Sequence, residues 1–186
     1  MSTSIHIDNY SLNPYGYLSR LYTQTSSSTP ITNTIVETSL LDGGVGTLTV
    51  PANGFKVGDS FRAVLIGHIS SLNNHTLHIR IKTGGIALAD TGVITMPATT
   101  IKHWRLEIDF TIRAIGASGV AKIVSGGNFI YTKNASNAFE GNNFSVETTT
   151  GFDTTISNTL AITAQWGTAN AGDIIFSEIF TLNKTY

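Results

Sequence analysis

The clearest pattern in the chain is a strict alternation of apolar and polar residues over positions 101–116. The apolar residues share one parity: Trp104, Leu106, Ile108, Phe110 and Ile112. The polar and charged residues share the other: Arg105, Glu107, Asp109, Thr111 and Arg113. Because a period of two separates the two faces of a β-strand, this segment predicts a long strand with one face in a core.

The same alternation, interrupted by Gly and Asn turns, recurs along most of the chain and predicts about eight to ten strands. Segments with this alternation cover 31–41, 46–51, about 57–72, 77–82, 86–90, 92–97, 101–116, 121–133, 144–150, 154–167 and 174–182. No segment of useful length has the helical period of 3.6 residues. We therefore expect an all-β fold, an antiparallel β-sandwich. Strands in this number with uneven loops favour a jelly roll, and an immunoglobulin-like sandwich is the alternative.

Residues 1–30 differ from the rest of the chain. Tyrosine and leucine crowd into the first part, and the stretch 23–30 is a polar linker by composition. The segment is either a disordered terminus or an N-terminal arm that orders on a neighbouring subunit. The expected organisation is an arm and linker over 1–30, followed by a single jelly-roll domain over 31–186.

The composition narrows the classes of function. Charged residues make up 12% of the 186 positions and the formal net charge is −1, so nucleic-acid binding is not expected. The chain has no cysteine, which excludes disulfides, thiol catalysis and Cys-type zinc sites. No apolar run is long enough to cross a membrane, and the N-terminus lacks the pattern of a secretory signal. We expect a soluble protein made in the host cytoplasm, without membrane insertion.

Candidate metal and phosphate sites are weak. His75 and His78 form the only close histidine pair in the sequence, and no third metal ligand can be named. The glycine pairs at 43–44, 84–85 and 126–127 do not match a phosphate-binding loop. The last pair indicates a bulge or close packing instead. No cofactor and no metal are expected.

Two carboxylates on one strand face are the only candidate for acid–base chemistry. Glu107 and Asp109 lie two positions apart, within reach of a shared substrate. Arg105 and Arg113 flank them on the same face, which favours a charge-balanced ladder or a subunit interface. With no nucleophile–base pair to name, we expect no enzymatic activity and no catalytic residue.

Four segments carry motifs beyond simple alternation. In the first, 46–67, a short strand is followed by Pro-Ala-Asn and then by Phe-Lys-Val-Gly-Asp, which opens the next strand. The others are 77–85, 104–119 and 160–173. These segments resemble structural proteins of tailed phages and of large double-stranded DNA viruses. With the closing strand, the resemblance spans about 31–182. It implies a β-sandwich in a virion and no particular reaction. A single jelly roll of this size is similar to the small subunits of vertex capsomers (pentons), and to decoration and fibre-head modules.

We therefore expect a virion structural protein that assembles as a symmetric oligomer, in a vertex (penton) capsomer. The expected partners are copies of itself, as a pentamer or a trimer, and other capsid proteins. The expected interface residues are Tyr10, Tyr15, Tyr17, Tyr22, Arg105, Glu107, Asp109 and Arg113. The alternative is a head or decoration module of a viral fibre or tail that binds a host glycan or receptor through loop 134–143. Trp104 and Trp166 are the aromatics that would suit a sugar.

Overall fold

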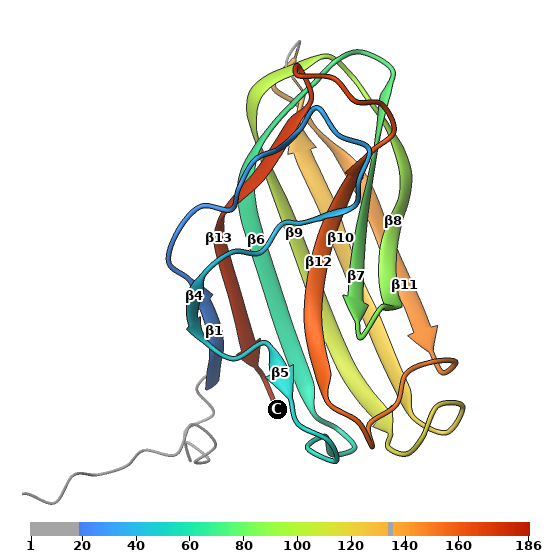
Figure 1. Ribbon diagram of the computed structural model, residues 1–186. Coiled ribbons are helices and arrows are strands. Elements are labelled where there is room, and N and C mark those ends of the chain that lie inside the picture. The colour runs from blue at the N-terminus through green and yellow to red at the C-terminus, as the bar shows by residue number, and fades with distance from the viewer. Residues whose placement is uncertain (1–18, 134–135) are drawn as a thin grey trace, which may run out of the picture.

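A computed structural model describes residues 19–133 and 136–186, and within these residues it contains strands and no helix (Figure 1). Thirteen described strands form two antiparallel sheets. Sheet A contains β1 (Ser19–Gln24), β2 (Ile31–Thr32), β4 (Gly44–Gly46), β6 (Ser60–Ser71), β9 (Thr99–Ala114), β10 (Lys122–Thr132), β11 (Phe139–Thr148) and β13 (Ile174–Lys184). Sheet B contains β3 (Thr38–Ser39), β5 (Thr49–Val50), β7 (His75–Thr83), β8 (Ile86–Met96) and β12 (Asn158–Trp166). The predicted all-β sandwich is confirmed.

Strands far apart in the sequence pair in a nested order. The order of sheet A is β11-β10-β9-β6-β13-β1-β4, and that of sheet B is β3-β12-β7-β8. β6 thus pairs with β13, β7 with β12 and β9 with β10. At the facing edges of the two sheets, Asn142 Nδ2 of β11 donates to Thr91 O of β8 (3.0 Å). The consecutive strands β7 and β8 pair within one sheet, and the jelly-roll connectivity stays a prediction.

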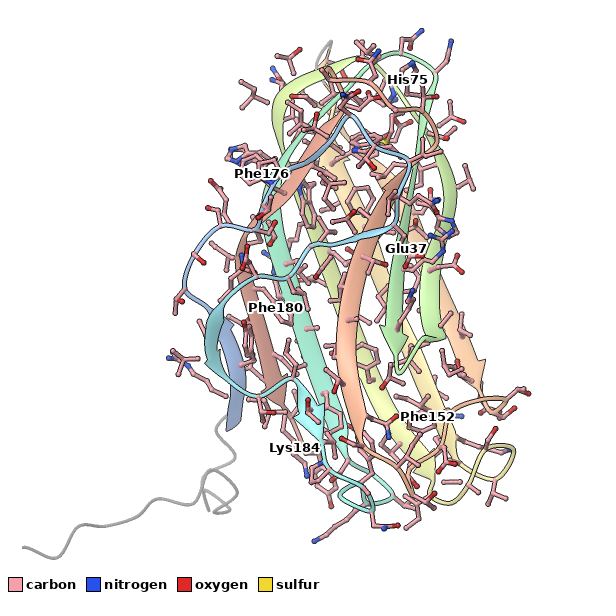
Figure 2. The ribbon with its side chains drawn as sticks, in the orientation of Figure 1. Glu37, His75, Phe152, Phe176, Phe180 and Lys184 are labelled. Carbon is pink, nitrogen blue, oxygen red and sulfur yellow. The ribbon has the colours of Figure 1, made fainter. Side chains whose placement is uncertain are left out.

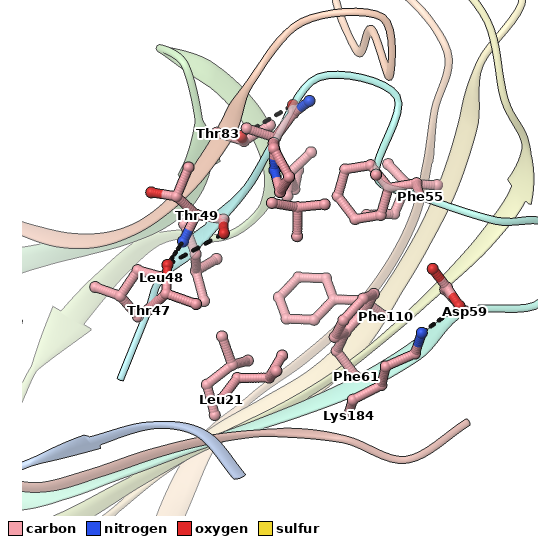
Figure 3. A pocket seen from close by; sticks show the side chains of 18 of the residues that line it. Leu21, Thr47, Leu48, Thr49, Phe55, Asp59, Phe61, Thr83, Phe110 and Lys184 are labelled. Carbon is pink, nitrogen blue, oxygen red and sulfur yellow. Dashed lines mark hydrogen bonds and ion pairs between the residues drawn. The ribbon is translucent and has the colours of Figure 1, made fainter. Parts of the chain in front are cut away.

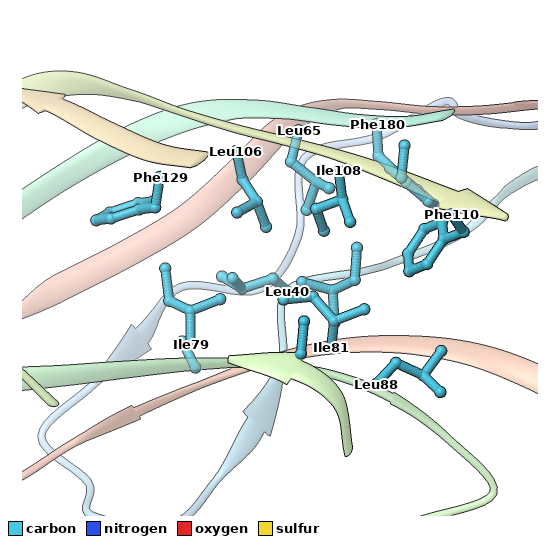
Figure 4. Packing of buried hydrophobic residues seen from close by; sticks show 14 of the residues in the cluster. Leu40, Leu65, Ile79, Ile81, Leu88, Leu106, Ile108, Phe110, Phe129 and Phe180 are labelled. Atoms are coloured by element: carbon cyan, nitrogen blue, oxygen red, sulfur yellow. The ribbon is translucent and has the colours of Figure 1, made fainter. Parts of the chain in front are cut away.

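The core lies between the sheets and follows the period of two. The five alternate apolar residues of β9 from Trp104 to Ile112 are all buried, and Leu106, Ile108 and Ile112 have no exposed surface. From sheet B, Ile79 and Ile81 project toward them, and Leu40 enters from the segment that crosses between the sheets (Figure 4). Burying such a side chain stabilises the fold by about 1.5–3 kcal/mol.

The boundary expected at residue 30 is wrong. Residues 19–24 form β1, which pairs with β13 on one side and with β4 on the other. Tyr22 is buried in the core, and its hydroxyl donates to Asp42 O (2.5 Å). In the stretch expected as a linker, Ser28 is buried and its backbone N–H donates to Ser177 O (2.8 Å). Described residues before 31 therefore belong to the sandwich, because β13 offers β1 a free edge.

Other expected elements differ in extent. The expected strands 86–90 and 92–97 form one strand, β8, and within the expected strand 46–51 only Gly46 of β4 and the two residues of β5 are in strands. In the expected strand 31–41 only β2 and β3 are paired, β2 with β13 of sheet A and β3 with β12 of sheet B. The chain between them crosses from one sheet to the other, so it cannot pair throughout. The expected loop 134–143 overlaps β11, which begins at Phe139. Pairing with β10 along its whole length outweighs the low strand propensity of the Gly-Asn-Asn stretch.

Candidate functional site

The charged residues predicted on β9 lie on the outer face of sheet A and balance one another. Arg105 Nε donates to Glu107 Oε1 (2.8 Å), and Arg62 of β6 lies 3.4 Å from Glu107 Oε2. The hydrogen bond from Arg105 is the main reason that the pKa of Glu107 is lowered from its ordinary value. The charged form of Glu107 is thus held in an ion pair on this face.

The other two predicted residues of β9 extend the same outer face. Asp109 is exposed and lies in register with Arg62. Arg113 Nη1 lies 3.8 Å from Glu147 Oε2 of β11, and Lys122 of β10 approaches the other oxygen of Glu147 at 3.9 Å. The structure thus places the four β9 residues on one surface with compensated charge, which extends over β6, β10 and β11.

Of the predicted interface tyrosines, the structure describes Tyr22, which does not join that surface. Tyr22 is held in the core between β13 and β4, so it has no free side chain to offer a neighbouring subunit. Tyr10, Tyr15 and Tyr17 lie outside the described residues.

One end of the sandwich exposes a set of large apolar side chains that were not among the residues predicted from the sequence. They lie in the loops 51–59, 115–121 and 149–157 and at the C-terminus, which meet at the lower end in Figure 1. Backbone bonds join these loops: Asn53 N donates to Thr154 O (2.8 Å), and Thr154 N donates to Gly116 O (2.9 Å). Between 48% and 82% of each side chain is exposed. We call this surface the apolar end; its residues are Val57, Ile115, Val120, Ile156 and Tyr186.

The opposite end differs in its turns, which carry asparagine and threonine, as at 73–74 and 168–170. A buried carboxylate, Asp173, joins two of these turns. Large apolar residues are exposed near this end too: Leu72, Ile101, Phe139, and Ile35 and Val36 beside the 168–170 turn. The apolar end is therefore distinguished by the backbone bonds that gather its loops and not by the number of its exposed apolar side chains.

A cavity of about 200 Å³ lies between the sheets at the apolar end (Figure 3). Four phenylalanine rings line it, from two strands of sheet A and from two loops: Phe55, Phe61, Phe110 and Phe152. Leu21 of β1 and the segment 47–51 form another part of the wall. Thr47, Pro51 and Gly54 line the cavity and are exposed, so the cavity reaches solvent beside them.

The polar groups at this cavity already have partners. Asp59 is buried; its carboxylate accepts a bond from the backbone N–H of Lys56 (2.9 Å) and lies 2.6 Å from Lys184 Nζ. Thr83 Oγ1 donates to Asn158 Oδ1 (3.1 Å). Because these groups satisfy one another, the cavity offers an occupant an apolar surface and little hydrogen bonding.

The histidines separate into unrelated contacts. His75 Nδ1 lies 2.6 Å from Asp173 Oδ2, and the other carboxylate oxygen accepts a bond from Leu72 N (2.9 Å). His78 Nε2 lies 3.3 Å from Asp90 Oδ1 on the outer face of sheet B. Figure 2 shows His75 at the end away from Phe152 and Lys184. Within residues 19–133 and 136–186, no group of three or more His, Asp or Glu side chains is placed to hold a metal ion.

The two tryptophans are core residues. Trp104 and Trp166 are each 1% exposed, and their indole N–H groups donate to backbone carbonyls, that of Trp104 to His68 O (3.0 Å) and that of Trp166 to Ile31 O (3.1 Å). Neither ring is available to stack on a sugar. The part of the glycan-binding alternative that relied on these aromatics therefore has no support in the geometry.

Comparison with models of protein families, with curated proteins and with solved structures found no match to this chain. In the described part of the chain, no helix has the length and hydropathy needed to cross a bilayer.

Proposed function

We propose that this chain is a structural subunit of a virion, without enzymatic activity, that assembles with copies of itself and with other capsid proteins. The proposed unit is a single sandwich of jelly-roll type in a symmetric vertex capsomer. The observation that carries the proposal is the apolar end. Isolated exposed apolar residues are normal, but several gathered on one surface indicate an interaction site.

The size of this surface favours assembly with several contacts over a single pairing. Fully burying one large apolar side chain contributes about 1.5–3 kcal/mol, so five side chains that are each 48–82% exposed contribute about 5–9 kcal/mol. Association itself costs about 4–15 kcal/mol. The free energy gained by one contact through the apolar end thus roughly equals the cost of association. A closed ring in which each copy has two neighbours, standing on a shell, adds the further contacts required.

The outer face of sheet A supports the same proposal. A neighbouring copy that covers this face would bury charges that are already paired, because Arg62, Arg105 and Glu107 contact one another. Burial of an unpaired charge is what makes most charged surfaces unsuitable as interfaces. The face can therefore pack against a neighbour with part of its charge already compensated.

The test is the mass of the full-length protein by light scattering behind a sizing column, over a range of concentrations. We expect a pentamer, or a trimer, in equilibrium with the 19.9-kDa chain. The double variant Val120→Lys/Ile156→Lys should keep its fold and lose assembly. The control Val93→Lys changes a side chain that is 67% exposed on β8, away from the apolar end, and should assemble normally. A monomer at every concentration, or normal assembly of the double variant, would contradict the proposal.

The alternative of a glycan- or receptor-binding head or a decoration module stays a prediction. Its test is a glycan array with the full-length protein, and a specific hit lost on changes within 136–143 would favour it over the capsomer.

A further inference from the structure

The cavity at the apolar end has the size of a small-ligand site (Figure 3). Its volume is about 200 Å³, and it reaches solvent beside Thr47, Pro51 and Gly54. An apolar cavity of about 150 Å³ is already large enough to bind a benzene ring. We propose that this cavity binds a neutral apolar molecule of the size of one substituted aromatic ring.

The polar groups of the cavity wall disfavour a charged or strongly polar occupant. Asp59 is paired with Lys184 and with the backbone N–H of Lys56. Thr83 donates its hydroxyl hydrogen to Asn158. A buried water needs about two to four polar partners, and a polar group buried without a partner costs free energy. The wall therefore favours an apolar group over water and over a polar ligand.

The phenylalanine rings favour an aromatic occupant. Phe55 meets Phe61 edge to face at a centroid distance of 6.0 Å, and it meets Phe152 at 5.9 Å. Aromatic rings in edge-to-face and offset arrangements attract one another beyond the area that they bury. A further ring inside the cavity can join this arrangement, because the ring of Phe110 lines the cavity as well.

The rim of the cavity is formed before any ligand binds. Backbone bonds run from Asn53 N to Thr154 O (2.8 Å) and from Gly54 N to Pro51 O (2.9 Å). A preformed pocket saves the free energy of ordering its loops on binding. The inference does not depend on the proposed assembly, because all the residues that line the cavity belong to one chain.

Isothermal titration calorimetry of the full-length protein with toluene and with phenol tests the class of ligand. The two molecules have nearly the same shape and differ by a methyl group in place of a hydroxyl. We expect toluene to saturate at about one molecule per chain and to bind at least about tenfold more tightly than phenol, whose hydroxyl meets polar groups that are already paired. No binding of toluene, or equal affinity for the two molecules, would overturn the proposal.

Two matched variants test the location of the site. Val50→Phe adds a ring to the cavity wall and should weaken toluene binding at least about tenfold. Val93→Phe makes the same change on β8, at a side chain that is 67% exposed, and should leave toluene binding unchanged. Normal binding by Val50→Phe would overturn the location. If toluene does not bind to the original protein and Val50→Phe loses assembly, an apolar side chain of a second copy fills the cavity and the proposal is wrong.

A measurement on the original protein covers the case in which Val50→Phe does not fold. Nuclear Overhauser effects from toluene protons to phenylalanine ring protons report which rings the ligand touches. Phe110 lines the cavity and is 4% exposed, whereas Phe139 is 76% exposed on β11. Contacts with Phe110 would support the proposal. Contacts with Phe139 and none with Phe110 would mean that toluene binds the surface, and would overturn it.

Discussion

Two adjacent glycines in β10 should respond oppositely to the same substitution. A Cβ atom on Gly127 would lie closer than 3.0 Å to the backbone oxygen of Glu107 in β9, where no flexible side chain can move aside. A Cβ atom on Gly126 would meet its nearest neighbour, Phe144 O, at 3.8 Å, an ordinary contact. The glycine pair recognised in the sequence is thus close-packed at one of its two positions.

The magnitudes follow from these contacts. Overpacking costs about 1–3 kcal/mol, and pushing β10 away from β9 weakens one or two ladder hydrogen bonds worth about 1 kcal/mol each. We therefore expect Gly127→Ala to destabilise the fold by about 2–5 kcal/mol. Gly126→Ala reduces the entropy of the unfolded chain and should stabilise by about 0.4–1 kcal/mol. Since 1 kcal/mol shifts the Tm by about 2–4 °C in a chain of this length, Gly127→Ala should lower the Tm by roughly 4–20 °C.

Urea unfolding followed by tryptophan fluorescence measures both variants. Trp104 in sheet A and Trp166 in sheet B are each 1% exposed, so the signal reports both sheets. Protein concentration is held constant, because assembly adds to apparent stability. A Gly127→Ala variant within about 0.5 kcal/mol of the original, which is the usual effect of a harmless surface change, would refute the packing described for β9 and β10.

Two other substitutions test polar contacts. Glu37 contacts Lys82 Nζ at 2.7 Å, and this bond is the main cause that lowers the pKa of Glu37; Glu37→Gln should cost about 1 kcal/mol at neutral pH. Because the pKa of Glu37 is lowered in the folded state, its contribution to stability is complete above the ordinary value of 4.5 and is lost as the pH falls through the folded-state pKa. The difference in unfolding free energy between the original protein and Glu37→Gln, measured by urea unfolding, should therefore shrink in acid. A difference that stays constant with pH would contradict the ion pair. Asp173→Ala removes the acceptor shared by His75 and Leu72 in a fully buried site and should cost about 3–5 kcal/mol in the same assay, whereas a cost below about 1 kcal/mol would mean that the carboxylate does not hold these turns.

Some features of the candidate site could be predicted from the sequence and others could not. The β9 ladder was predicted because residues two apart on one strand share a face whatever else the chain does. The apolar end left a local signal, apolar residues inside turn segments such as Val57-Gly58 and Ile115-Gly116, which the search for alternating strands passes over. The cavity left none, since its walls come from loops and strands more than a hundred positions apart.

The strand class, the buried side of β9 and its polar face follow from the sequence, because each depends on the local geometry of an extended chain. The burial of Tyr22 in the core depends on a tertiary contact, since the partner strand β13 lies about 160 residues later. Which of the two glycines is close-packed likewise depends on how near β9 approaches β10. Local conformation is encoded by neighbouring residues, whereas pairing, cavities and exposed ends depend on contacts that form only when distant segments meet.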